Sequence, residues 1–244
     1  MIVPHIRGTF GRSHAAYLIW LLSRGEETVR RREETRLEEQ GLDALLDDPR
    51  TCNALLAGRG CSTADPALVF YVLVRHALLE DGIGDRAVAD YLAALILTFG
   101  REGRAYRIAD SDPAEYRYLV DIVAGSEGAG GRRAFLLRAH LGEFALWLSG
   151  LFPDYITGRA QRRGAPGLGY YEQLGASGFR LAADSAEARQ HGLARLYRDC
   201  ADFFPALRVA LNRVADRHLF PATGDRIDRL LRQVADSFRT RVPD

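Results

Sequence analysis

Two histidine–carboxylate pairs come closest to a catalytic or metal-binding pattern in this sequence. His140 and Glu143 are three residues apart in one predicted helix, and Glu187 and His191 are four residues apart in another. Carboxylate-bridged metal sites in helical proteins take a Glu from each of two helices and a Glu-x-x-His motif from each of two others. Neither pair has that order and spacing. We therefore expect ordinary polar contacts and no metal, and we keep a helical metal- or small-ligand-binding enzyme that uses these four residues as the alternative.

Arginine and tyrosine gather between residues 154 and 172. This Arg/Tyr cluster has few acids nearby, namely Asp154 and Glu172, and consists of Tyr155, Arg159, Arg162, Arg163, Tyr170 and Tyr171. Arginine and tyrosine are enriched at protein–protein contacts. The same side chains would also attract phosphate or lipid headgroups. The composition of the cluster predicts a contact surface.

The basic residues exclude several enzyme classes. The chain has no lysine, so all 33 basic residues are arginine. P-loop enzymes, pyridoxal enzymes and protein kinases each need a lysine amine. The three cysteines have the spacing of neither a zinc site nor a redox pair. We expect no cofactor and no catalytic residue, and the sequence favours a protein that is not an enzyme.

The charge balance and the apolar segments limit the partners. The formal net charge is +1, so no global field attracts DNA, RNA or an anionic bilayer. A helix-turn-helix interpretation of the turn at 82–84 fails because the helix that follows it is too apolar to read base edges. No stretch approaches the roughly 20 apolar residues of a spanning helix. We expect no DNA partner, and a cytoplasmic protein or one peripheral on the cytoplasmic side of a membrane.

The elements that would position these residues are helices. Apolar residues recur with helical spacing, and no sustained alternation of β-branched residues is present. The pattern predicts an all-α bundle of about nine to ten helices without significant sheet. It also predicts one domain over 1–244, with a candidate joint in the glycine-rich segment 125–131 that would separate two helical halves.

Capping residues predict where several helices begin and end. Asp65-Pro66 opens a core helix that is apolar on all sides, and Asp112-Pro113 with Glu115 opens a helix that ends at Gly125. Gly175 and Gly178 either weaken their helix or mark a close helix contact. We further expect continuous helices over 26–46, 185–204 and 225–239.

The leading hypothesis for function is a non-enzymatic accessory or scaffold subunit that binds protein partners in a larger assembly. One version is a subunit on the cytoplasmic face of a photosynthetic or respiratory membrane complex. Both ends of the chain carry few apolar residues, so we expect a partner to hold them. A nucleic-acid-binding regulator is the second alternative, and its affinity would fall steeply with salt.

Overall fold

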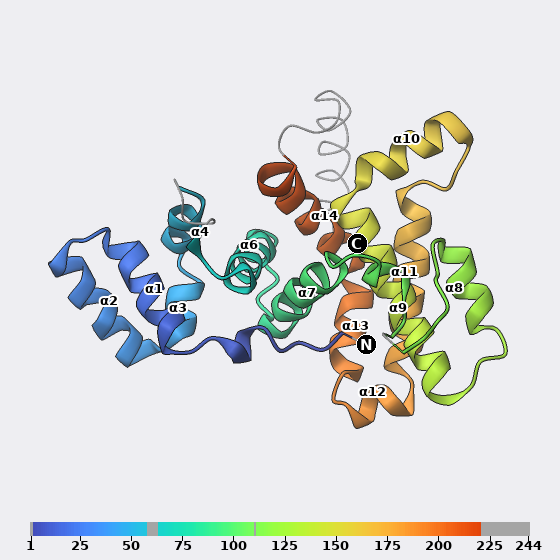
Figure 1. The fold of residues 1–244 in the computed structure, drawn as a ribbon, viewed down its shortest axis with the longest axis horizontal. Helices are drawn as coiled ribbons and strands as arrows, with labels where there is room; N and C mark the ends of the chain where they lie inside the picture. The colour runs from blue at the N-terminus through green and yellow to red at the C-terminus, as the bar shows by residue number, and fades with distance from the viewer. Residues whose placement is uncertain (1, 58–62, 110, 221–244) are drawn as a thin grey trace. The chain divides into compact units, whose positions relative to one another are not determined.

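Helices form the regular secondary structure in the part of the chain that the structure describes. The computed structural model describes residues 2–57, 63–109 and 111–220, and these residues form 13 α-helices and no strand (Figure 1). The predicted all-α class is confirmed. The helix count is slightly above the predicted range, partly because glycines divide two segments that we expected to be continuous.

The chain divides into two compact units. The first comprises Ile2–Leu97 and the second begins at Thr98. The glycine-rich segment 125–131 lies inside the second unit, where it connects α8 (Leu119–Ser126) to α9 (Gly131–Leu151). These two helices pack against each other. The single-domain organisation stays a prediction.

The first unit is built around α6 (Pro66–Glu80), the predicted core helix. Asp65 caps it by accepting a hydrogen bond of 3.1 Å from the Ala67 amide, as the Asp-Pro pattern predicts. Its buried residues lie on all sides of the helix axis, as expected for a core helix. The other helices of this unit are α1 (Arg12–Ser23), α2 (Glu27–Gln40), α3 (Leu42–Leu46), α4 (Pro49–Leu56) and α7 (Arg86–Phe99), whose last residues belong to the second unit.

Residues of the N-terminal segment contact their own unit, where the Phe10 ring lies 5.5 Å from the Tyr71 ring. Ile2, Ile6 and Phe10 are buried, and the Arg7 amide donates a hydrogen bond of 2.9 Å to the Asp90 carboxylate. Whether a partner also holds this end stays a prediction. The C-terminal end and the helix predicted over 225–239 lie outside the described residues.

The helix predicted over 26–46 is broken at Gly41. This residue has φ +77°, which favours glycine and ends α2 before α3 begins. The charged helix α2 is solvated over most of its surface, and yet its buried residue is a carboxylate, Glu33. Burying a carboxylate is costly unless it is paired and hydrogen-bonded.

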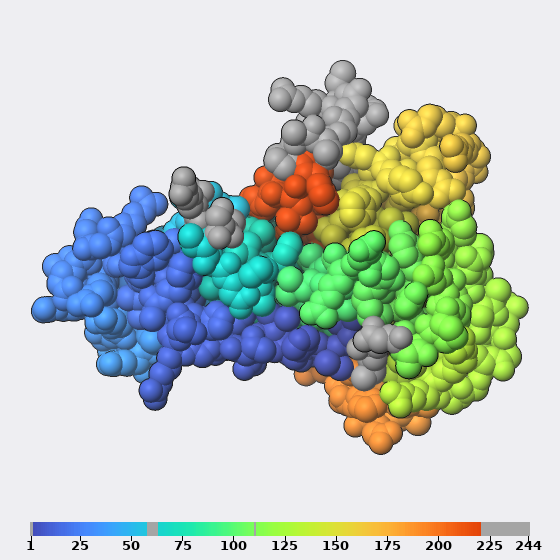
Figure 2. Space-filling view, in the orientation of Figure 1, coloured from blue at the N-terminus to red at the C-terminus, as the bar shows by residue number. Residues whose placement is uncertain are grey.

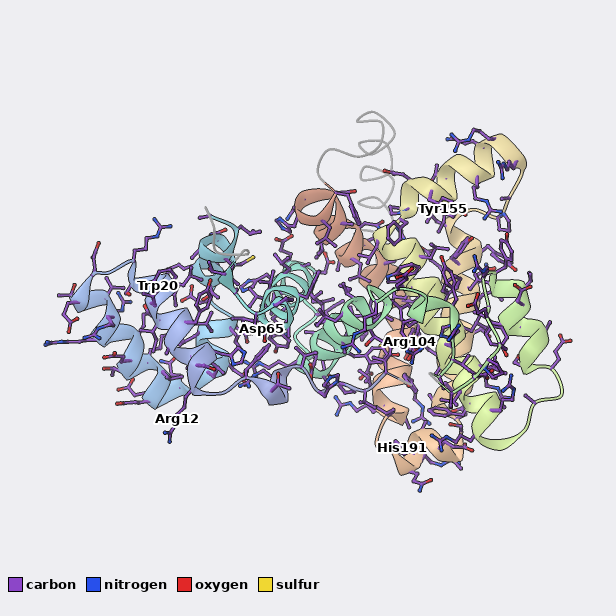
Figure 3. The ribbon with its side chains drawn as sticks, viewed as in Figure 1. Arg12, Trp20, Asp65, Arg104, Tyr155 and His191 are labelled. Carbon is purple, nitrogen blue, oxygen red and sulfur yellow. The ribbon has the colours of Figure 1, made fainter. Side chains whose placement is uncertain are left out.

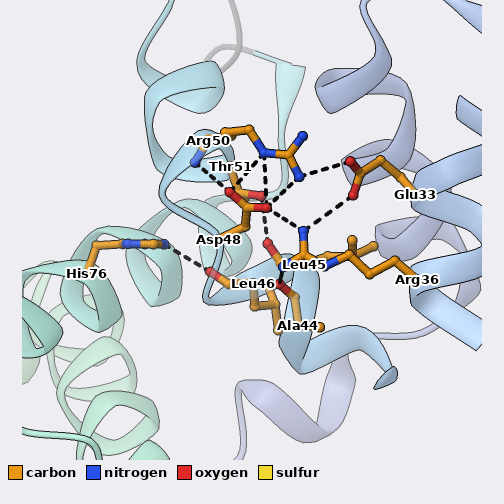
Figure 4. A network of polar contacts seen from close by, with 9 residues as sticks. All are labelled: Glu33, Arg36, Ala44, Leu45, Leu46, Asp48, Arg50, Thr51 and His76. Carbon is orange, nitrogen blue, oxygen red and sulfur yellow. Dashed lines mark hydrogen bonds and ion pairs between the residues drawn. The ribbon is translucent and has the colours of Figure 1, made fainter. Parts of the chain in front are cut away.

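An arginine–carboxylate network satisfies Glu33 (Figure 4). Arg50 on α4 donates to Glu33 at 2.9 Å and also binds Asp48. Arg36 on α2 contacts both carboxylates and donates to the Ala44 carbonyl at 2.8 Å. The two guanidinium groups hold the pKa of Asp48 well below its ordinary value, although burial opposes this shift. The network joins α2, α3 and α4 through two arginines and two carboxylates, so removal of any one of these groups unbalances the buried charge.

Replacing Glu33 by Gln should destabilise the protein by about 1–3 kcal/mol, because the amide presents N–H groups where the arginines need an acceptor. Urea unfolding measures the change. The matched control is Glu38→Gln on the exposed face of α2, which should leave the free energy of unfolding within about 0.5 kcal/mol. Equal effects of the two substitutions would contradict the role given to the network.

The second unit is assembled on α9. Helices α8, α10, α11, α12 and α14 all pack against α9, and α11 also packs against α13. The helices not yet given bounds are α10 (Pro153–Arg163), α11 (Leu168–Ala183), α12 (Ala186–Gln190), α13 (Ala194–Asp202) and α14 (Phe204–Val214), which is followed by a π-helical turn at Ala215–Leu219.

Glycines let α9 and α11 approach closely. A Cβ atom at Gly178 would lie 2.8 Å from the Arg138 carbonyl oxygen and 2.9 Å from the Gly142 amide nitrogen. A Cβ at Gly142 would meet the Phe179 ring at 2.6 Å, and one at Gly175 would meet the Phe204 ring at 2.4 Å. These glycines therefore mark a close helix contact, the second of the two interpretations that the sequence allowed.

Two predicted helices in this unit are wrong in extent. Asp112 does accept a hydrogen bond from the Ala114 amide at 2.9 Å, but the helix begins only at Leu119. The Tyr116 amide instead donates to the Tyr106 carbonyl at 2.7 Å, so a non-local bond overrides the local cap. The helix expected over 185–204 is likewise interrupted at Gly192, where φ is +68°.

Replacing Gly178 by Ala should destabilise the protein by several kcal/mol, because the methyl group would meet backbone atoms of α9 that cannot move independently. Gly169→Ala, on the same helix, is the control. Its Cβ would meet no atom within 4 Å, so the gain in helix propensity should leave stability unchanged or raise it by up to about 1 kcal/mol. Thermal unfolding of the two variants measures the difference. A Gly178→Ala variant as stable as the wild type would contradict the close packing.

Candidate functional site

A groove lined by aromatic side chains lies on the second unit. Its volume is about 560 Å³, within the range of sites that bind small molecules or anchor side chains. In the space-filling view, the surfaces of α10 (yellow) and α8 (green) that border it adjoin on one face (Figure 2). The lining residues are Tyr106, Arg117, Tyr118, Leu119, Val120, Phe144, Trp147, Leu148, Phe152, Tyr155, Arg159, Ala165, Pro166, Tyr170 and Tyr171.

Helix termini position most of this lining. Tyr118 precedes α8, and its amide donates to the Asp121 carboxylate at 3.3 Å. Pro153 occupies the first turn of α10 and fixes its start directly after α9. Gly164, with φ +60°, ends α10 and turns the chain toward α11. The groove thus lies where α8, α9, α10 and α11 meet.

Aromatic contacts form the floor of the groove. The Trp147 ring is stacked on Phe144 at 6.0 Å and meets Phe152 edge-on at 5.0 Å. Phe144 is buried, whereas Trp147 and Phe152 are half-buried. Burial raises the pKa of Tyr171, so this hydroxyl stays neutral over the physiological range.

Two arginines supply the positive charge. The Arg117 guanidinium lies 5.2 Å from the centre of the Tyr106 ring and forms an ion pair with Glu115 at 3.0 Å. Arg159 lies over the Tyr118 ring at 5.9 Å and over the Tyr155 ring at 5.5 Å. Such cation–π contacts contribute about 0.5–1 kcal/mol at exposed sites.

A buried polar network fixes the helices beneath the groove. The Arg208 side chain on α14 donates from Nε to Glu172 at 2.6 Å and from Nη1 to Asn212 at 2.7 Å. Asn212 in turn donates to the carbonyls of Ser149 and Gly150 at 2.8 and 2.6 Å. The end of α9 and the start of α11, which carry the groove residues, are therefore both held by α14.

The structure brings together part of the predicted Arg/Tyr cluster. Tyr155, Arg159, Tyr170 and Tyr171 line the groove, and Figure 3 shows Tyr155 on α10. Arg162 and Arg163 lie in the last turn of the same helix, are exposed, and are absent from the lining. Whether the cluster is a contact surface stays a prediction.

Sequence reasoning missed the half of the groove contributed by α8 and α9. The pattern Tyr116-Arg117-Tyr118 repeats the arginine–tyrosine composition of the cluster and could have indicated it. The predicted helix over 112–125 concealed this signal, because it gave these residues a regular helical role. The α9 contribution had no signal of its own, since aromatic residues in an apolar helix are normally core.

The four metal candidates do not converge. His140 and Glu143 are buried on α9 with 3.9 Å between Nδ1 and Oε2, too long for a hydrogen bond. Glu187 and His191 border a separate hollow near Arg132, and Figure 3 shows Tyr155 and His191 at opposite ends of the second unit. The described residues contain no group of three or more side chains able to hold a metal ion.

His140 is enclosed by rings instead. Phe99, Tyr116 and Phe144 lie 5.6, 6.4 and 6.0 Å from it, centre to centre. Its Nε2 atom is buried and has no hydrogen-bond partner among the described residues. Burial, with a smaller contribution from the charge of Arg104, lowers the pKa of His140 to about 3. His140 is therefore neutral in the folded protein at any physiological pH.

Protonation of His140 should therefore oppose folding in acid. In the unfolded chain His140 binds a proton near the ordinary pKa of about 6.5, and in the folded chain it does not. Its contribution to the free energy of unfolding is therefore complete above a pH of about 6.5 and is lost as the pH falls toward 3. We expect a loss of about 2 kcal/mol from this residue between pH 7 and pH 5.

The variant His140→Phe should flatten the pH dependence of the unfolding free energy in this window, because the ring is retained and the ionisable group is removed. The exposed His191→Gln is the control and should retain the wild-type slope. Parallel pH profiles for wild type and His140→Phe would show that His140 does not cause the loss of stability in acid.

No helix in the described part of the chain is long and apolar enough to cross a membrane. Comparison of the chain with protein-family models, curated proteins and solved structures gave no match.

Proposed function

We propose that this chain is a non-enzymatic interaction protein that binds a segment of a partner protein in the aromatic groove, as an accessory subunit of a larger assembly would. The observation that carries the proposal is the composition of the groove. Eight of its 15 lining residues are Tyr, Phe or Trp and two are Arg, the side chains that dominate binding energy at protein contacts.

The shape of the groove supports a protein segment. Three large side chains of its rim are more than half exposed, Tyr118 at 55%, Val120 at 58% and Tyr155 at 52%. An exposed apolar rim around a deeper aromatic floor suits an inserted side chain whose backbone runs across the surface. A pocket that encloses most of a small ligand would instead hide its rim.

The chemistry of the lining supports binding over catalysis. Among the described residues of the groove there is no Asp, Glu, His, Ser or Cys. General acid–base and nucleophilic catalysis depend mainly on these side chains. The tyrosines could donate hydrogen bonds to a bound segment, and the arginines could orient it.

Photocrosslinking tests the proposal. The crosslinking residue p-benzoylphenylalanine replaces Tyr118 at the rim in one variant and Leu181, exposed on α11 outside the groove, in a control. We expect a defined partner peptide to crosslink in the source cells at position 118 and not at position 181. A synthetic copy of that peptide should bind the purified protein, and Val120→Asp should weaken the binding at least about tenfold, because it places a charge in the apolar rim.

Crosslinking of the same proteins at both positions would contradict the proposal. So would a synthetic peptide whose affinity is unchanged by Val120→Asp. Because Val120 is exposed, Val120→Asp should not impair folding, and circular dichroism of the variant checks this directly.

A further inference from the structure

Resting on the proposed function, we infer that the bound segment carries a carboxylate beside its apolar anchor, and that Arg159 binds this carboxylate. An acidic residue adjacent to an aromatic or large aliphatic residue is the sequence feature that the partner should present.

Arg159 is held in place without being neutralised. Its Nη1 donates to the Tyr155 hydroxyl at 3.1 Å, and its guanidinium lies over the rings of Tyr118 and Tyr155. Its Nε is shielded from solvent and has no hydrogen-bond partner in the described residues. No described carboxylate oxygen lies within 4 Å of its nitrogens, whereas Arg117 is paired with Glu115. The guanidinium of Arg159 is therefore held in the lining with a charge that no described carboxylate balances.

The local charge favours an anion. Arg162 and Arg163, in the next turn of α10, also form no ion pair with a described carboxylate, and the groove lining contributes no acid to offset them. Aromatic walls lower the local dielectric, which strengthens an ion pair formed against Arg159. A neutral segment would bury part of this charge without compensation, and a basic segment would be repelled.

A carboxylate fits better than a phosphate. A carboxylate carries one negative charge and matches the planar guanidinium, and one unpaired arginine faces the groove. Phosphate recognition generally uses a cluster of arginines, and the second arginine of the lining is already paired. The surrounding apolar lining requires that the charge be attached to a hydrophobic group, as in a peptide with neighbouring aromatic and acidic residues.

The two tryptophans of the chain permit a direct assay. Trp147 lies in the groove, and Trp20 is 61% exposed in the first unit, so Trp20→Phe leaves Trp147 as the fluorescent reporter. The probes are the capped peptides acetyl-Gly-Phe-Glu-Gly-amide and acetyl-Gly-Phe-Gln-Gly-amide, which differ only in the charge. In the Trp20→Phe background we expect both to change Trp147 emission, with the acidic peptide binding about fivefold more tightly.

Arg159→Gln should abolish this preference by weakening the acidic peptide and leaving the neutral peptide unchanged. Arg163→Gln, on the same helix but outside the lining, is the matched control and should preserve the preference. A preference that survives Arg159→Gln, or that Arg163→Gln reduces equally, would overturn the assignment to Arg159.

The probes also separate the two proposals. Equal binding of the acidic and neutral peptides would refute the carboxylate inference and leave the groove as a binding site for an apolar anchor. Absence of any Trp147 response to either peptide at millimolar concentration would count against the groove itself.

Discussion

The close approach of α9 and α11 is the constraint on which the second unit depends. Gly142, Gly175 and Gly178 remove the side chains that would hold the two helices apart, so Phe179 and Phe204 can pack directly against backbone. With the helices this close, the late turns of α9 and the first turn of α11 lie at one end of the contact. Those turns carry Trp147 and Tyr171 and therefore define the groove.

Helices with strong local signals could be predicted from the sequence. The Asp65-Pro66 cap and an apolar body on every side placed α6 correctly, because local capping and burial agree there. At Asp112-Pro113 the local cap and the burial of neighbouring residues favour different structures. The local turn forms, but the Tyr116 amide bonds to Tyr106 and the Tyr116 side chain is buried. A cap is worth about 1 kcal/mol, which such a non-local arrangement can outweigh.

The candidate site shows the same division between local and non-local information. Tyr155 and Arg159 are one turn apart on α10, and their hydrogen bond can be anticipated from that spacing. The contact of Arg159 with Tyr118 cannot, because it depends on how α8 and α10 are each placed on α9. Likewise, nothing in the sequence distinguishes Glu33 from the other acids of α2, and only the positions of α3 and α4 make it a buried member of the network.

The partners of a buried polar group indicate whether that group has a structural role or a binding role in this molecule. Glu33 and Arg208 are buried with short hydrogen bonds to charged partners, so they complete the fold. His140 leaves one nitrogen without a partner in the described residues but is enclosed by rings and stays neutral, which limits the cost. Arg159 cannot lose its charge, and its Nε is equally unsatisfied. Because Arg159 lines an open groove, an anion that binds there can balance a charge that no described carboxylate pairs with.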